Sequence, residues 1–237
     1  MSWQAKTDFF GLATAANGLE VTESNENKTA STAEGHNEKG DVVAFEVFGE
    51  TMSPSNSYVL GKDLTLSTLP KCGAPITGPT GYTDKKFTLG SITISTSAGA
   101  PPTIQATGEE IPSGTTHSDC TYTFPSTTLK LCHHAQILWG AFTLGGEGCY
   151  LQQANYTAGG TISRATKDGS TVSFDVVDGK LEVQITIQQT SSTAPTLTAG
   201  TDWTITAPLT CSSPDADYPS WTATLSRYLE HDAQSGS

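Results

Sequence analysis

An alternating run in the C-terminal half of the chain is the feature that most constrains the fold. From Leu181 to Gln189, apolar and polar residues alternate, so leucine, valine and two isoleucines share one face of an extended strand. Two β-rich runs precede it, Thr161–Thr166 and Thr171–Val177, and Asp-Gly pairs at 168–169 and 178–179 separate the three runs. Asp-Gly readily adopts the positive φ values of tight hairpin turns. The pattern predicts a β-meander with one buried face and one wet face.

The rest of the chain is similar, with turn signals at intervals of about 8–12 residues. Residues 129–144 could be drawn as a helix, but we prefer two strands there, and any helix is expected within this stretch. No internal repeat indicates a propeller or solenoid. We therefore expect an all-β fold, a β-sandwich or rolled β-barrel of about ten strands with at most one short helix. The further predicted strands cover residues 41–48, 57–69, 87–96, 103–107, 120–124, 129–135, 137–144, 203–207 and 220–228.

The polar and the Pro/Gly-rich stretches suggest where the domain begins and ends. Residues 22–40 hold almost no large apolar group, so we expect an N-terminal arm and mobile loop over residues 1–40. Residues 70–84 hold three prolines and three glycines and predict a long irregular loop, because strands of the same type resume after it. The prediction is a single β-domain over residues 41–229 and a flexible tail over residues 230–237.

Charge and cysteine content exclude some classes of function. Acidic residues outnumber basic ones 24 to 12, a net charge of −12, which argues against a tight grip on nucleic-acid phosphates. No basic stretch leads into an apolar run at the N-terminus, and no stretch of about 18 apolar residues occurs, so we expect a protein made in the cytoplasm without membrane contact. The five cysteines, odd in number and irregularly spaced, are then most simply reduced thiols.

One cluster resembles the start of a metal site. Cys132 and His134 would share a face of a strand, with His133 on the opposite face. A closed zinc site would need two further ligands, which the fold alone would have to bring from Cys120, Cys149 or His117. No Cys-x-x-Cys pair accompanies them, so ordinary packing is the better interpretation, and we expect no metal and no cofactor.

Catalytic patterns are also weak. Glu109 and Glu110 are adjacent, so their carboxylates would diverge on a strand, whereas a glycosidase pair faces across a cleft. The sequence contains no nucleophile elbow, P-loop or dinucleotide fingerprint. We therefore expect no enzyme. Core and interface packing is the expected role of the scattered aromatic residues Trp3, Trp139, Trp203, Trp221, Tyr150, Tyr156 and Tyr218.

From Asp41 onward, the order of elements resembles the major tail tube proteins of long-tailed bacteriophages. Gly40–Leu60 is similar to that family's opening strand, a break after Gly-Glu, and a paired return strand. Lys85–Ile111 resembles a long hairpin-like passage that ends in a Gly-acid turn. The third similar segment has two parts. Its first part, Leu129–Leu144, contains a His-Ala-Gln sequence before an apolar Gly-Ala-Phe, and its second part, Asn155–Ile187, contains the meander with Asp-Gly turns.

The resemblance implies a structural virion protein whose subunits form hexameric rings, stacked into a hollow tube through which DNA passes. Its partners would be further copies of itself and the terminator, tape measure and baseplate proteins, with DNA only a transient, non-specific cargo. Assembly would take place in the host bacterial cytoplasm, and the product would lie in the virion tail. We also expect an acidic lumen that repels phosphates. The candidate interface residues are Trp3, Phe9, Phe10, Pro75, Pro79 and Tyr82.

Other classes of function remain open on the sequence alone. A capsid decoration or tail terminator protein would form a capsid-bound trimer or a single closed ring. A carbohydrate-binding or adhesion β-sandwich would need clustered exposed aromatic residues and, commonly, an export route. A β-fold hydrolase is disfavoured by the missing motifs.

Overall fold

The computed structural model describes residues 6–117, 122–167, 170–212 and 218–230. Within them the chain is all-β, as predicted, with fourteen strands and one short 3-10 helix. The elements are β1 (Leu19–His36), β2 (Val42–Leu60), β3 (Leu64–Thr65), η1 (Leu66–Thr68), β4 (Pro75–Thr77), β5 (Lys86–Ser97), β6 (Ala100–Ile111), β7 (Thr116–His117), β8 (Thr128–Leu129), β9 (Phe142–Gly145), β10 (Cys149–Lys167), β11 (Ser170–Gln189), β12 (Thr196–Ala199), β13 (Thr204–Cys211) and β14 (Ser220–Tyr228).

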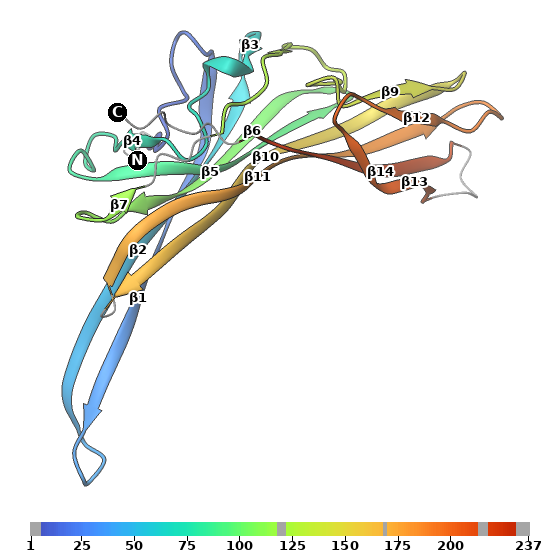
Figure 1. Cartoon of the computed structure of the whole chain (residues 1–237). Coiled ribbons are helices and arrows are strands. Elements are labelled where there is room, and N and C mark those ends of the chain that lie inside the picture. The colour runs from blue at the N-terminus through green and yellow to red at the C-terminus, as the bar shows by residue number, and fades with distance from the viewer. Residues whose placement is uncertain (1–5, 118–121, 168–169, 213–217, 231–237) are drawn as a thin grey trace, which may run out of the picture.

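One ten-stranded sheet dominates the molecule (Figure 1). Its main path runs β1-β2-β6-β5-β10-β11-β14-β13, with β4 added beside β5 and β7 beside β11. All neighbours along the main path are antiparallel, and only β7 lies parallel to its partner β11. Two small sheets, β12-β9 and β3-β8, complete the described part of the chain. The strands β1 and β13 are the two edges of the main path.

The buried face of the large sheet contains a continuous row of apolar side chains. Strand register places six residues directly beside one another across β2, β6, β5, β10, β11 and β14, each at most 1% exposed. A second layer covers this face, since the Trp139 indole meets the Tyr156 ring edge-on at 5.5 Å between centroids. Leu66, Leu129 and Leu138 belong to the same core. The residues of the row are Tyr58, Ile104, Ile94, Tyr156, Val183 and Leu225.

The opposite face of the same six strands is polar. Because successive side chains on a strand point to opposite faces, the register that aligns the core also aligns hydroxyl and amide groups. One such row is Ser57, Gln105, Thr93, Thr157, Glu182 and Ser226, in which Glu182 is a carboxylate. The next begins with the apolar Val59 and continues with Thr103, Ser95, Asn155, Gln184 and Thr224. The predicted division of the Leu181–Gln189 segment into a buried and a wet face is confirmed.

The expected loop over residues 22–40 is wrong for most of its length, because β1 occupies Leu19–His36. Strand β1 pairs with β2 from Leu19 opposite Leu60 to His36 opposite Val42, which satisfies backbone groups although Leu19 is its one buried side chain among those described. The expected break after Gly49-Glu50 is also wrong. These two residues lie opposite Ala30 alone, between the Phe48–Ser31 and Thr51–Thr29 pairs, so they form a bulge within a continuous strand.

The second predicted Asp-Gly turn is likewise a bulge. Asp178 lies within β11 and has a φ of 56°. Val177 pairs with Thr161 and Lys180 pairs with Gly159, so two residues of β11, Asp178 and Gly179, lie opposite one residue of β10. A Cβ on Gly179 would stand 2.4 Å from the Tyr122 ring, so glycine is needed there for close packing. The predicted strand boundary at Val177 is therefore wrong, and β11 continues through it. The first pair, Asp168-Gly169, lies outside the described residues.

The predicted strands over residues 129–144 are mostly wrong. Strand β8 ends at Leu129 and β9 begins at Phe142, and a loop joins them. The Gln136 side chain closes this loop: its Oε1 accepts from the Lys130 backbone N–H at 2.9 Å, and its Nε2 donates to the Lys130 carbonyl at 2.8 Å. These bonds supply the backbone partners that a strand ladder would have supplied. The single described helix, η1, lies at 66–68 and not here.

Candidate assembly interface

The hairpin of β1 and β2 extends far from the body of the molecule (Figure 1). In the second half of β2, from Met52 to Leu60, every second side chain is buried, whereas all side chains from 42 to 47 are exposed. Only this second half pairs with β6, through Ser55–Val59. We call the projecting part, residues 28–51, the arm, which differs from the N-terminal arm expected over residues 1–40.

The arm exposes large apolar side chains. Val42, Val43, Phe45 and Val47 are 52%, 64%, 59% and 46% exposed. Phe45 lies opposite Glu34 across the hairpin, and Val47 lies opposite Thr32, so acidic and polar groups border the apolar ones. A two-stranded hairpin alone is marginally stable in water, and contiguous exposed apolar surface typically marks an interaction site. The arm is therefore the strongest candidate for a contact with another molecule.

A hydrogen-bond network joins the buried half of β2, which follows the arm, to the N-terminal segment. The Asn56 side chain accepts from the Phe9 backbone N–H at 2.9 Å and donates to the Thr7 carbonyl at 2.7 Å. The carboxylate of Asp8 accepts from the Tyr58 hydroxyl at 2.7 Å and from the Ala13 N–H at 2.7 Å. Burial and the nearby Asp8 charge raise the pKa of Tyr58. The buried half of β2 is thus a rigid base for the arm.

A second set of contacts ties β1 to the Pro/Gly-rich loop. The Tyr82 hydroxyl donates to the Glu26 carboxylate, which also pairs with the Lys28 ammonium at 2.9 Å. These two hydrogen bonds lower the pKa of Glu26, with the Tyr82 contribution the larger. The same bond to Glu26 raises the pKa of Tyr82. The charged groups at this point are therefore already paired within the chain.

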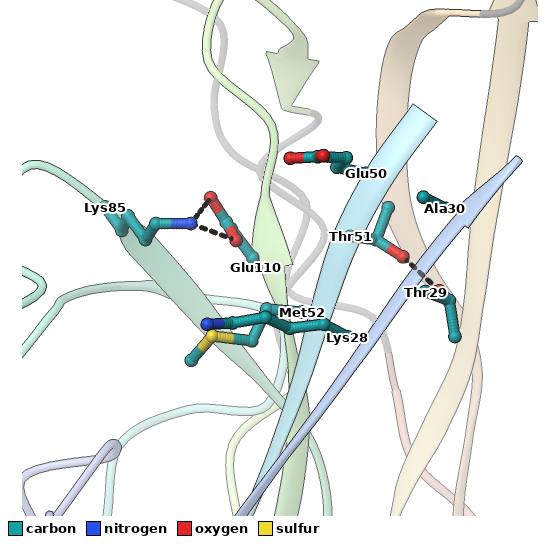
Figure 2. A pocket seen from close by; sticks show the side chains of 8 residues that line it. All are labelled: Lys28, Thr29, Ala30, Glu50, Thr51, Met52, Lys85 and Glu110. Carbon is teal, nitrogen blue, oxygen red and sulfur yellow. Dashed lines mark hydrogen bonds and ion pairs between the residues drawn. The ribbon is translucent and has the colours of Figure 1, made fainter. Parts of the chain in front are cut away.

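A groove of about 330 Å³ lies where the arm leaves the body (Figure 2). The Lys85 ammonium points at the Glu110 carboxylate and donates to both of its oxygens at 2.8 Å. On β1 and β2, the hydroxyls of Thr29 and Thr51 face each other at 2.8 Å. The groove joins ion-paired and hydroxyl groups from three strands, β1, β2 and β6, and from the loop before β5, and its lining residues include no nucleophile with an adjacent base. The remaining lining residues are Lys28, Ala30, Glu50 and Met52.

The structure places the predicted interface residues in different surroundings. Phe9 and Phe10 are each 2% exposed, and Phe9 packs against Tyr82 at 5.4 Å between ring centroids. Both phenylalanines belong to the hydrophobic core of the chain, so they expose almost no surface. Tyr82 and Pro79 are half-buried and Pro75 is exposed, whereas Trp3 lies outside the described residues.

The sequence interpretation missed the arm. The sequence predicts a strand over residues 41–48, but not that this strand projects from the body with Val43, Phe45 and Val47 exposed. The available signal was the neighbouring acidic and polar run of residues 22–40, which offers no apolar face to cover them. A strand with apolar residues on both faces and a wholly polar partner cannot be buried by that partner.

The candidate metal ligands do not form a site within the described residues, where no group of three or more His, Cys, Asp or Glu side chains could hold an ion. Cys132 and His134 lie in the loop after β8, so the shared strand face on which the prediction rested is absent. Cys120 lies outside the described residues.

The adjacent carboxylates diverge, as expected. Glu109 pairs with the Arg164 guanidinium, whereas Glu110 pairs with Lys85 on the other face of β6. Among the aromatic residues, Trp139, Trp203 and Tyr156 are core residues at 8%, 6% and 0% exposure. Tyr150 and Tyr218 are exposed, Trp221 is half-buried.

Comparison with known proteins assigns no family. No protein-family model matches the chain, and no curated protein matches it. Across the described ranges, no helix combines the length and apolar character that crossing a membrane would require.

Proposed function

We propose that this protein is a structural virion subunit that self-assembles into stacked, hexameric rings and so forms the hollow tail tube of a long-tailed bacteriophage. The order of elements in the sequence supplies the resemblance to that family. The single observation that carries self-assembly is the arm, a two-stranded projection with four large apolar side chains between 46% and 64% exposed.

The two-faced sheet supports the tube part of the proposal. A subunit that lines an aqueous channel needs a broad polar face backed by a core, and six strands here supply hydroxyl and amide rows opposite the apolar row. Within the six strands of these two rows the single acid is Glu182, which pairs with Lys180 at 2.8 Å, and the rows reach further acids only on the edge strand β1, at Glu23 and Glu20. We therefore replace the acidic lumen with a near-neutral one, in which uncharged groups give DNA phosphates few points of attachment.

The sheet edges support contact between neighbouring copies. Strand β1 ends the large sheet, and among the described residues no second strand pairs with its outer side. Edge strands are an aggregation hazard unless a partner pairs with or covers them. In the proposed tube, adjacent subunits perform this task, and the terminator, tape measure and baseplate proteins cover the two ends.

Sedimentation velocity of the purified chain tests this function. The unaltered protein should form rings or longer assemblies, and the variant Val43→Ser/Phe45→Ser/Val47→Ser should remain monomeric because its arm has lost its apolar contacts. Val172→Ser, which removes a 40% exposed side chain from β11, is the matched control and should assemble normally. An arm variant that assembles as well as the control would contradict the proposal. A single closed ring that never stacks would favour a terminator or decoration protein instead.

A further inference from the structure

A second exposed apolar surface lies in the loop after β8. Leu131 and Ile137 are 44% and 45% exposed, although both stand in a loop whose conformation is fixed. The Gln136 side chain bonds both backbone groups of Lys130, and the Asp63 carboxylate accepts from the Leu131 N–H at 2.8 Å. We call residues 130–137 the clamped loop. Such a rigid surface loses little conformational entropy when it binds a partner.

The clamped loop also has a chemistry complementary to that of the arm. It carries Lys130, His133 and His134 and no acidic residue, in a chain of net charge −12. The Lys130 side chain is 60% exposed, although it pairs with Asp63 at 2.8 Å. The arm, in contrast, borders its apolar residues with Glu34 and Glu46. The acidic neighbours of the arm would therefore meet an ammonium and two imidazoles on the loop, where the one adjacent acid, Asp63, is already paired with Lys130.

The two surfaces lie at opposite ends of the subunit. The clamped loop follows β8, which pairs with β3, and β3 lies at the top of Figure 1 while the arm points to the bottom. One chain cannot bring them together, but two copies can. Such a contact joins different surfaces of identical subunits, so it is heterologous and repeats into a ring or a filament.

We propose that the arm of one copy docks on the clamped loop of the next, through Val43, Phe45 and Val47 against Leu131 and Ile137. This inference rests on the proposed function and names the surface that receives the arm. The occupant of the loop is a second copy of this chain, because the chain itself offers the matching apolar and acidic surface.

Mixing two defective variants tests the inference. The arm variant Val43→Ser/Phe45→Ser/Val47→Ser keeps an intact loop, and the loop variant Leu131→Ser/Ile137→Ser keeps an intact arm. Each should sediment as a monomer alone, and the equimolar mixture should give a 1:1 heterodimer that grows no further, because only one working contact exists per pair. The control Val172→Ser/Ile205→Ser removes two aliphatic side chains that are 40% and 38% exposed elsewhere, and it should assemble like the unaltered protein.

The other outcomes overturn the inference in distinguishable ways. A loop variant that assembles fully while the arm variant stays monomeric would show that the arm docks elsewhere, and the proposed function would stand. A mixture that stays monomeric would contradict the proposed arm–loop contact. A control that also fails to assemble would show that the loss of assembly is not specific to that contact, and it would contradict the inference too. Unaltered protein that stays monomeric at its highest soluble concentration, or an arm variant that assembles normally, would count against the proposed function as well.

Discussion

The Tyr58 hydroxyl, buried in the second half of β2, donates a hydrogen bond of 2.7 Å to the Asp8 carboxylate in the N-terminal segment. Asp8 also accepts from two backbone N–H groups of its own segment, those of Phe10 and Ala13. This bond links residues 50 positions apart and fastens the segment across the strand from which the arm projects. This hydrogen bond helps to fix the buried half of β2, which is the base of the arm.

Tyr58→Phe should destabilise the fold. The substitution leaves a partly buried carboxylate with one bond fewer, and we expect the free energy of unfolding to fall by about 1–3 kcal/mol. Urea denaturation followed by tryptophan fluorescence measures the change. Tyr228→Phe, at a tyrosine that is 75% exposed, is the control and should change stability by less than about 0.5 kcal/mol. Equal effects from the two variants would show that the Asp8 bond contributes nothing.

Ile94→Ala should be more costly. Ile94 is fully buried at the centre of the core row, directly between Ile104 and Tyr156. Large-to-small substitutions at such sites lose transfer free energy and leave a cavity, so the expected loss is about 2–5 kcal/mol. Val172→Ala at an exposed site of β11 provides the comparison, and denaturant midpoints at equal m-value give the difference. A loss below that of the control would contradict the core assignment.

Stability should fall in alkaline solution. Burial raises the pKa of Cys72 from 9.0 to about 11, and burial is also the main cause of the raised pKa values of Tyr58 and Tyr156. The unfolded chain releases these protons at lower pH than the native chain does, so the native state binds more protons and its stability decreases as pH rises above about 9. Urea midpoints at pH 8 and pH 10 measure the effect. A midpoint unchanged or higher at pH 10 would contradict these burial assignments.

Cys72 should resist thiol reagents in the native state. Its Sγ lies 3.0 Å from the Leu89 carbonyl and 2.9 Å from that of Gly90, and its side chain is fully buried. The reaction requires an accessible thiolate. Burial makes the Cys72 thiol inaccessible, and its raised pKa keeps it protonated. Iodoacetamide at pH 8 followed by peptide mass spectrometry should label Cys132 well before Cys72, and urea should remove the difference. Rapid labelling of Cys72 in the native protein would show that the loop over residues 70–84, which contains Cys72, opens readily.

Local patterns predicted much of the large sheet. The alternation of Leu181–Gln189 and the run Ser220–Tyr228 lie in strands of the observed structure, the second with its bounds unchanged. In both segments the side chains decide the conformation, because one face packs on the core. Periodicity records that kind of burial directly.

The errors occur where backbone pairing, rather than side-chain burial, decides the structure. Leu19–His36 is a strand because β2 pairs with it, and no residue of 22–40 needs to be buried for that pairing. Asp178-Gly179 has the composition of a turn, yet it forms a bulge because β10 continues alongside. The clamped loop has an apolar pattern typical of a strand, but the hydrogen bonds of Gln136 hold it in another conformation. Each outcome depends on a partner segment distant in sequence.

The candidate site was harder to predict than the fold for the same reason. Phe9 and Phe10 are apolar residues near a terminus, and only the fold shows that Asn56 and Phe87 hold Phe9 in the core. Phe45 is an apolar residue in an alternating strand pattern, and only the fold shows that this part of its strand projects from the body of the molecule. Exposure depends on what the tertiary structure covers, which a single segment does not record.

Negative-stain electron microscopy of the purified chain, across a range of protein and salt concentrations, tests the central claim most directly. The account predicts rings and hollow tubes, favoured by added salt because salt screens repulsion among subunits of net charge −12. It also predicts that the arm variant shows single particles under the same conditions. Uniform single particles of the unaltered protein at every concentration, or tubes formed equally well by the arm variant, would contradict it.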